Sequence, residues 1–492
     1  MDKKSSNIFF TEDSMLNTLH GKFNLRVGLI DADLLDHGTR HPNLALLKIA
    51  GFLNDNNILF NLIKDSNESS EKYDIIFLSK VFSFTKLPII YKRALNTQEE
   101  TKFYVGGTGF YANVESINEF ILKRSEDFES LEKNKFLSLF KNHCGGVNKK
   151  GINMARQKPY YRLYDEYIQC QKALGRKEHY YKDYQKYSIG FLTRGCVRHC
   201  PFCVNKLENN ILPYSKIEWF IDNERDGNGR LIRPYIYLWD DNFLAAEYSI
   251  WKPLLLELIN TKRPFQFRQG LDERMLADSP YGEEMAQMLS QARYHGDFIF
   301  AFDNWKDREK IEKALKIWKK YNPKKGTKFY LFCGFKQRKN DLQKLYKDIY
   351  ELFQRIKILM QYGCVGYVMR HEDYKESPLA NIYVQIARWC NQQQFYKKMS
   401  FWEYTYRNQT YWEEQAGFEV SVKIKSYEEF IKDYSSGYYT KEDSRGQRRK
   451  ICKTLQTLID MLSLFEDHRD ELLEMFNYKM SVLRDPNLWE NQ

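Results

Sequence analysis

The chain of 492 residues contains 43% hydrophobic and 16% aromatic residues, enough for two to four folded domains, which excludes a disordered chain. No apolar run approaches the ~20 residues that a membrane-spanning helix needs, and residues 1–6 lack the apolar stretch that we would expect of a secretory signal. Lys and Arg exceed Asp and Glu by 76 to 65, giving a formal charge of +11. We therefore expect a cytoplasmic protein with reduced thiols and no membrane partner.

The first 150 residues alternate apolar strands with amphipathic helices, after a polar arm at residues 1–22. The pattern predicts a doubly wound parallel sheet over residues 23–150. Its strands are expected at residues 25–30, 58–63, 73–81 and 103–105, with a helix over 42–50. The turn formed by residues 106–109, Gly-Gly-Thr-Gly, allows close backbone approach, either to a ligand or as a tight strand exit. We favour the strand exit.

Residues 151–186 have no clear periodicity and are interpreted as a linker. Further strands are expected at residues 187–193, 235–239, 265–267, 298–302, 328–332 and 365–369. Helices are expected at residues 217–224, 308–321, 341–361 and 455–473, and residues 400–492 are expected to be helical overall. Polar residues follow directly where the apolar strands end, and parallel strands bring such ends to one edge of a barrel or sheet. This edge is the expected site of chemistry.

Three cysteines, Cys196, Cys200 and Cys203, stand in one short run after the strand at 187–193. Three soft thiolates on one loop suit an iron–sulfur cluster, and a four-iron cluster with three thiolates keeps one iron open for reaction. The alternative is a zinc site completed by His199 or by a distant cysteine. The other cysteines are scattered singly at Cys144, Cys170, Cys333, Cys364, Cys390 and Cys452. Because no second paired Cys/His element exists, we favour the cluster.

The run from Gly195 to Cys203, with the aromatic Phe202 before its last cysteine, resembles the signature of the radical S-adenosylmethionine (radical SAM) superfamily. The resemblance covers residues 187–390 well and 25–150 loosely. It implies a partial (β/α)6 barrel over residues 187–399 and a [4Fe-4S] cluster on the three cysteines. It also implies that SAM chelates the open iron and is cleaved to a 5′-deoxyadenosyl radical, with a flavodoxin or ferredoxin as electron donor. The substrate stays open between RNA, a peptide and a small molecule.

The same resemblance suggests roles for individual residues, although it assigns no catalytic residue. Phe202 would lie beside the adenine of SAM. Near the methionine amino group, where the family usually has a Gly-Gly-Glu-like motif, this chain has Asp240, Asp241 and Asn242. Candidates for ribose or substrate contacts are Gln269, Asp272 and Asp303, since a carboxylate accepts both ribose hydroxyls. The residues flanking the first two cysteines, Arg194 and Arg198, either raise the cluster potential and meet a reductase or face solvent.

The N-terminal domain resembles the cobalamin-binding-like domain of many radical SAM proteins, but it lacks that domain's DxHxxG motif. His37 has Leu35 at the Asp position, and His41 has Leu44 at the Gly position. Cobalamin is therefore not predicted, and the domain is expected to be a scaffold or a cap facing the substrate.

Other features have plainer interpretations. Cys333 and Cys364 near strand ends are interpreted as small hydrophobic residues rather than as hydrogen donors or a second centre. The basic runs at residues 319–325 and 445–450 are interpreted as solvated faces rather than an RNA-binding patch. The class of hypothesis opposed to an enzyme is a non-catalytic zinc-binding or RNA-interaction protein.

Overall fold

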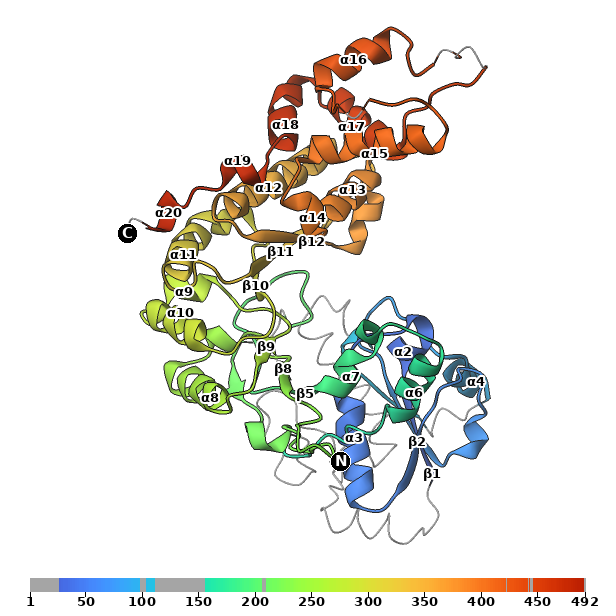
Figure 1. Cartoon of the computed structure of the whole chain (residues 1–492). Coiled ribbons are helices and arrows are strands. Elements are labelled where there is room, and N and C mark those ends of the chain that lie inside the picture. Colours follow the sequence, from blue (N-terminus) through green and yellow to red (C-terminus); the bar gives the residue numbers. More distant parts are fainter. Residues whose placement is uncertain are drawn as a thin grey trace, which may run out of the picture. The chain divides into compact units, whose positions relative to one another are not determined.

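The protein is described by a computed structural model covering residues 26–97, 103–110, 155–205, 209–421, 423–440, 442 and 446–490 (Figure 1). It divides into two compact units, residues 1–269 with 292–295 and residues 270–291 with 296–492. The expected arm at residues 1–22 and Cys144 lie outside the described residues. Within them the fold is α/β, and no helix is long and apolar enough to span a bilayer.

The first unit begins with a four-stranded sheet in the order β2-β1-β3-β4, and all of its neighbouring strands are parallel. Its strands are β1 (Arg26–Asp31), β2 (Leu59–Leu62), β3 (Ile75–Ser79) and β4 (Phe103–Gly106). Its helices are α2 (Ala32–His37), α3 (Leu44–Asp55) and α4 (Ile89–Thr97). Helix α3 packs into a core with Val27 and Leu29, whereas α4 packs with Ile76 and Leu78 in a separate core. Helices on both faces confirm the doubly wound sheet for this part of residues 23–150.

The segment expected to be a linker folds onto this sheet in its described part. It forms α6 (Asp165–Ala173) and α7 (Lys182–Lys186), and its Tyr161, Tyr164 and Tyr184 are buried with α3. The Tyr164 hydroxyl donates to Asp31 Oδ2 at 2.8 Å and accepts from the backbone N of Asn43 at 3.1 Å. A tyrosine can be buried deeply when its hydroxyl has such partners. The segment is thus part of the N-terminal core.

The rest of the first unit is built on a second parallel sheet, in the order β5-β8-β9. Its strands are β5 (Tyr187–Gly190), β8 (Tyr235–Leu238) and β9 (Phe265–Phe267), and α8 (Tyr248–Asn260) joins the last two. A short antiparallel ladder pairs β6 (Thr193–Arg194) with β7 (Leu212–Pro213).

The helix expected at residues 217–224 is wrong, because the chain makes only one 3-10 turn, Ile217–Trp219. The Phe220 ring instead lies against Gly190, where a Cβ would be 2.4 Å from the ring. The backbone N of Asp222 then donates to Ser188 Oγ at 2.9 Å. The apolar residues that suggested a helix therefore pack along β5.

The second unit contains a parallel sheet in the order β10-β11-β12. Its strands are β10 (Phe298–Ala301), β11 (Thr327–Cys333) and β12 (Val365–Arg370). The helices before and between them are α9 (Arg274–Asp278), α10 (Gly282–Gln291), α11 (Arg308–Tyr321) and α12 (Leu342–Gln361). The boundary between the two units falls inside residues 187–399, the range expected to form one core.

The C-terminal part is helical in its described residues, as expected. Its helices are α13 (Ala380–Cys390), α14 (Gln393–Tyr396), α15 (Phe401–Gln415), α16 (Tyr427–Ser435), α17 (Lys453–Leu464), α18 (Arg469–Phe476), α19 (Met480–Leu483) and α20 (Asn487–Glu490). The helix expected at residues 455–473 is interrupted, because Phe465 leaves helical geometry at φ −119° and ψ 55°.

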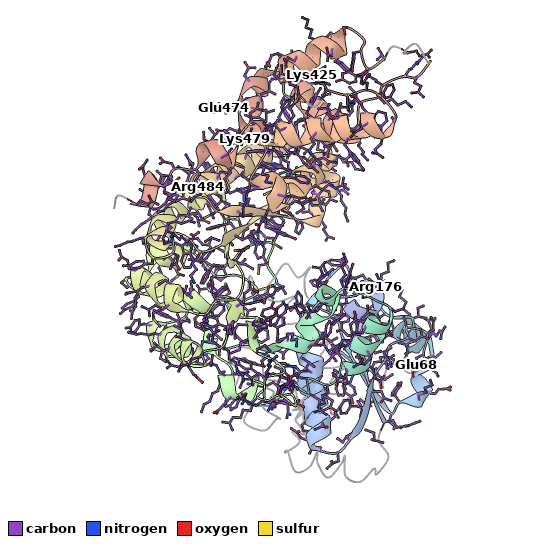
Figure 2. The ribbon with its side chains drawn as sticks, viewed as in Figure 1. Glu68, Arg176, Lys425, Glu474, Lys479 and Arg484 are labelled. Carbon is purple, nitrogen blue, oxygen red and sulfur yellow. The ribbon has the colours of Figure 1, made fainter. Side chains whose placement is uncertain are left out.

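Charged side chains extend from the ribbons of both units, among them Glu68, Arg176, Lys425, Glu474, Lys479 and Arg484 (Figure 2). The two basic runs are only partly solvated. Lys319 is buried, with its ammonium 5.7 Å from the centre of the Trp489 ring. Arg449 forms an ion pair with Glu413 at 3.2 Å. The expectation of purely solvated faces is therefore wrong for these two side chains.

Candidate functional site

The cysteine loop begins where β6 pairs with β7 and turns sharply at Gly195. This glycine has φ +105°, and a Cβ here would lie 2.0 Å from the backbone oxygen of Asn210. Any other residue would be strained by the left-handed backbone and would collide with the chain. The close approach thus requires glycine directly before Cys196.

The three cysteines are partly buried, and Cys196 and Cys200 are close enough for their charges to act on Cys203. Burial raises the pKa of Cys203 to about 11, the Asn205 amide lowers it, and the charges of Cys196 and Cys200 add to the rise. Backbone amides point at two of the sulfurs: Arg198 N lies 3.3 Å from Cys196 Sγ, and Asn205 N lies 3.5 Å from Cys203 Sγ. Thiolates at this place need a compensating positive centre.

In the described residues, no group of three or more His, Cys, Asp or Glu side chains is arranged to hold a metal ion. The fit of this loop to a cluster is therefore judged by donor chemistry. Three thiols on one turn, with N–H donors directed at their sulfurs, are the ligand type that iron–sulfur clusters use.

Asp240 and Asp241, which follow β8, hold the backbone that leads into the cysteines. Asp240 is buried and accepts from Leu192 N at 3.2 Å, Thr193 N at 2.6 Å and Thr193 Oγ1 at 2.7 Å. Asp241 accepts from Gly195 N at 3.0 Å and pairs with Arg194 Nε at 3.5 Å. Their carboxylates thus bind the cysteine loop itself, a role that the resemblance did not assign.

Burial raises the pKa of Asp240 to about 7, and the hydrogen bonds from Thr193 and Leu192 oppose the rise. Asn242, also buried, extends Nδ2 to 3.5 Å from Cys196 Sγ. The structure therefore brings Asp241 and Asn242 to the cysteines and places Asp240 behind the loop.

The remaining residues that were predicted to contact the cofactor or substrate do not all lie in the same unit as the cysteine loop. Phe202 is partly buried within the cysteine loop, and Gln269 is exposed just beyond β9. Asp272 belongs to the second unit, where Arg274 Nε donates to its carboxylate at 2.7 Å. Asp303 is also in that unit and accepts from Phe332 N at 3.2 Å. Both carboxylates have protein partners of their own.

Positive charge gathers beside the cysteine loop, and part of it was not predicted. Arg194 lies over the Phe191 ring at 4.1 Å. Lys48 on α3 is buried, donates to Ala155 O at 3.3 Å and lies 5.4 Å from the Tyr214 ring centre. Burial, and then the charge of Arg194, lowers the pKa of Lys48 to about 8. A buried lysine on an amphipathic helix gives no distinct sequence signal.

The structure also shows the surroundings of the glycine-rich turn after β4 and of the two histidines, His37 and His41. The turn after β4 is confirmed as a tight strand exit: Gly107 has φ +111°, and a Cβ there would lie 2.2 Å from Lys80 O. His37 stands beside the rings of Phe82 and Phe84, at centroid distances of 6.1 and 5.4 Å. His41 lies elsewhere, against Trp239 at 5.4 Å.

Cys333 and Cys364 are fully buried in the second unit. Burial raises the pKa of Cys333 well above its ordinary value and that of Cys364 to about 12. Such thiols stay protonated and behave as small hydrophobic residues, which agrees with the plainer interpretation.

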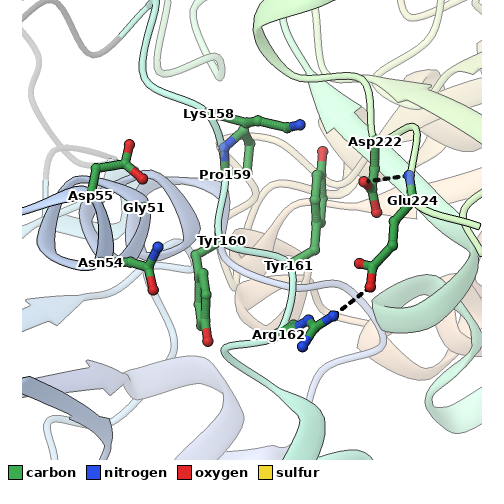
Figure 3. A pocket seen from close by; sticks show the side chains of 10 residues that line it. All are labelled: Gly51, Asn54, Asp55, Lys158, Pro159, Tyr160, Tyr161, Arg162, Asp222 and Glu224. Atoms are coloured by element: carbon green, nitrogen blue, oxygen red, sulfur yellow. Dashed lines mark hydrogen bonds and ion pairs between the residues drawn. The ribbon is translucent and has the colours of Figure 1, made fainter. Parts of the chain in front are cut away.

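A cavity of about 210 Å³ lies at the seam between α3 and residues 158–162 (Figure 3). Its wall includes Tyr161 and an ion pair between Arg162 and Glu224. Tyr161 is buried, and its hydroxyl donates to Phe220 O at 2.7 Å and accepts from Ile189 N at 2.8 Å. None of the three cysteines lines this cavity. We interpret it as a packing seam.

No protein-family profile matches the chain, and no curated protein matches its sequence. The interpretation of the site therefore depends on its residues and on the resemblance of the cysteine run.

Proposed function

We propose that the protein is a radical SAM enzyme with a [4Fe-4S] cluster on Cys196, Cys200 and Cys203. The observation that carries the proposal is the cysteine loop itself: three neighbouring thiols, N–H donors at two sulfurs, and a strand-end Asp241 and Asn242 beside them. When bound, the cluster would supply the electron that cleaves a carbon–sulfur bond of SAM. In this proposal the two three-stranded sheets are the strands of a partial (β/α)6 barrel.

The chain's own residues would prepare this site. Asp240 and Asp241 hold the loop backbone, so the thiols are positioned before the cluster binds. Lys48 and Arg194 supply positive charge that favours electron acceptance by an anionic cluster. The electron donor would be a flavodoxin or ferredoxin, and the substrate would be an RNA, a peptide or a small molecule.

Anaerobic reconstitution tests the proposal. We expect about four irons per chain and 5′-deoxyadenosine after reduction with SAM present. Replacing Cys196, Cys200 or Cys203 by Ala should abolish both. Cys170→Ala is the matched control, because Cys170 is exposed on α6, outside the loop, and both readouts should be unchanged. Stoichiometric zinc without SAM cleavage would refute the proposal in favour of a zinc-binding protein.

A further inference from the structure

One face of the β5-β8-β9 sheet carries a half-buried arginine among aromatic rings. Phe265 and Phe267 are fully buried, so strand alternation puts Gln266 and Arg268 on the opposite face. Strand pairing aligns Gln266 with Tyr237, and the guanidinium of Arg268 lies 4.8 Å from the Tyr237 ring centre. We call this side of the sheet the Arg268 face. Its half-buried residues are Tyr235, Trp239 and Arg268, and they border the buried Tyr187, Tyr237 and Gln266.

The guanidinium of Arg268 is held by side chains that carry no negative charge. Its NH1 donates to Gln266 Oε1 at 3.1 Å, and its NH2 lies 3.1 Å from His41 Nε2. A guanidinium only donates hydrogen bonds, so Nε2 must be the acceptor and the imidazole proton sits on Nδ1. That Nδ1 lies 2.5 Å from Asp183 Oδ2. Gln266 and His41 therefore orient the arginine, and Asp183 lies beside His41.

The charges around Arg268 do not balance. Among the described residues no carboxylate lies within ion-pair distance of its guanidinium, and Asp183 is engaged by His41. Burial lowers the pKa of His295, and the charges of Lys182 and Arg268 lower it further, against the opposing effect of Asp183. His295 contacts Tyr187 Oη at 3.1 Å, so the charges of both Lys182 and Arg268 reach this face.

A second, independent observation is a donor without an acceptor. The indole Nε1 of Trp239 is buried and has no hydrogen-bond partner in the described part of the chain. The Trp239 ring contacts the His41 ring, and the residue before it, Leu238, accepts from the backbone N of Arg268 at 2.8 Å. Buried donors are normally satisfied by protein or by ordered water, so this one is a donor that a ligand on this face could use.

We propose that the Arg268 face binds a nucleotide, with Arg268 contacting its phosphate. Two cations, Arg268 and Lys182, with one carboxylate that is engaged by His41, suit a phosphate group, which a guanidinium recognises through paired N–H donors. The half-buried ring of Trp239 provides a flat surface on which a base can stack, whereas the Tyr235 ring already contacts Tyr187 and His295. His41 and Gln266 are positioning residues. The nucleotide is the enzyme's substrate only under the proposed function, but its binding requires neither cluster nor SAM.

The test measures binding of uridine 5′-monophosphate to the full-length chain by calorimetry, with uridine and phenylacetate as comparison ligands. We expect the monophosphate to bind at least about tenfold more tightly than either. Arg268→Gln should weaken it by about tenfold or more. Arg225→Gln removes the same charge from an exposed turn of this unit and should leave binding unchanged. His41→Ala should weaken binding, and His41→Gln, whose amide oxygen can accept from Arg268, should restore it.

Three results would overturn the proposal: no detectable binding, equal binding by the Arg268→Gln chain, or tighter binding of phenylacetate, which would assign a carboxylate ligand. If the variant does not fold, labelling of the unaltered chain decides. Phenylglyoxal should modify Arg268 more slowly when uridine 5′-monophosphate is present, and equal rates would refute the site. A chain that binds the nucleotide but never cleaves SAM would refute the radical SAM function alone.

Discussion

Asp240 after β8 and Asp303 after β10 are both carboxylates at the ends of parallel strands, the first buried and the second half-buried, yet they bind different neighbours. Asp240 accepts three hydrogen bonds from residues 192 and 193, which lead into the cysteine loop. Asp303 accepts from Phe332 in the adjacent strand end, beside the buried guanidinium of Arg355. A polar residue at a strand end therefore indicates a site only when its partner is a loop that carries reactive side chains.

The largest loss of stability from a single substitution at neutral pH should come from Arg355, which holds the β10-β11 edge together. Its NH1 donates to Phe302 O at 2.7 Å and its NH2 to Phe332 O at 3.1 Å. Arg355→Met leaves these buried carbonyls without donors, so we expect a loss of about 3 kcal/mol or more in unfolding free energy. Chemical denaturation measures it.

Lys347→Met is the matched control, because this exposed lysine on the same helix forms only a weak pair with Glu351 at 3.9 Å. It should cost less than about 0.5 kcal/mol. If Arg355→Met were as stable as this control, the carbonyl contacts would not explain the edge.

The two carboxylates should also make stability depend on pH over different ranges. Burial raises the pKa of Asp240 from 3.8 to about 7 and that of Asp303 from 3.8 to about 6. A raised pKa in the folded state means that folding favours the protonated form. The stabilising effect of the protonated carboxyl is therefore complete below its pKa in the unfolded chain, and it is lost as pH rises through its pKa in the folded chain.

Each group should thus lower the unfolding free energy by up to about 1.4 kcal/mol per pH unit as pH rises above 4. The slope from Asp303 should end near pH 6 and that from Asp240 near pH 7. Asp240→Asn and Asp303→Asn should each remove one contribution, seen as a difference from the unaltered chain in denaturation at pH 5 to 8. Parallel pH curves for all three chains would contradict the assignment.

The sequence predicted the regular elements well wherever a single periodicity dominates. Strand β9 and helix α11 have the expected bounds, because their apolar residues have one clear spacing. The prediction of a helix at residues 217–224 was wrong because the Phe220 ring packs against Gly190. In the sequence alone, the apolar residues that make such tertiary contacts have a spacing like that of a helix. The prediction of a linker at residues 151–186 was wrong for a similar reason. Tyrosines of this segment are buried in the core, but their polar hydroxyls make the sequence look less apolar than a core segment.

The candidate sites also contain residues that the sequence predicts and residues that it does not. Cys196, Cys200 and Cys203 are neighbours in sequence, so their proximity was predictable. The contact between Arg268 and His41 joins residues 227 positions apart, and neither belongs to a motif. Alternation along β9 could have selected Arg268, because it shares a face with Gln266 whereas Gln269 does not. The partner histidine had no such signal.

The smallest effect concerns Asn242, whose Nδ2 lies 3.5 Å from Cys196 Sγ. Hydrogen bonds to a cluster's sulfur ligands stabilise its more negative, reduced form and so raise the potential. Under the proposed function, Asn242→Leu should lower the potential of the reconstituted cluster, and Asn242→Asp should lower it further, because it also adds a negative charge. Potentiometric titration followed by electron paramagnetic resonance measures both. Asn228→Leu, in an exposed turn, should leave the potential unchanged. If both Asn242 variants had the same potential as the unaltered chain, the end of β8 would act on the cysteine loop only through Asp240 and Asp241. It would then support the loop backbone, as Arg355 supports the ends of β10 and β11.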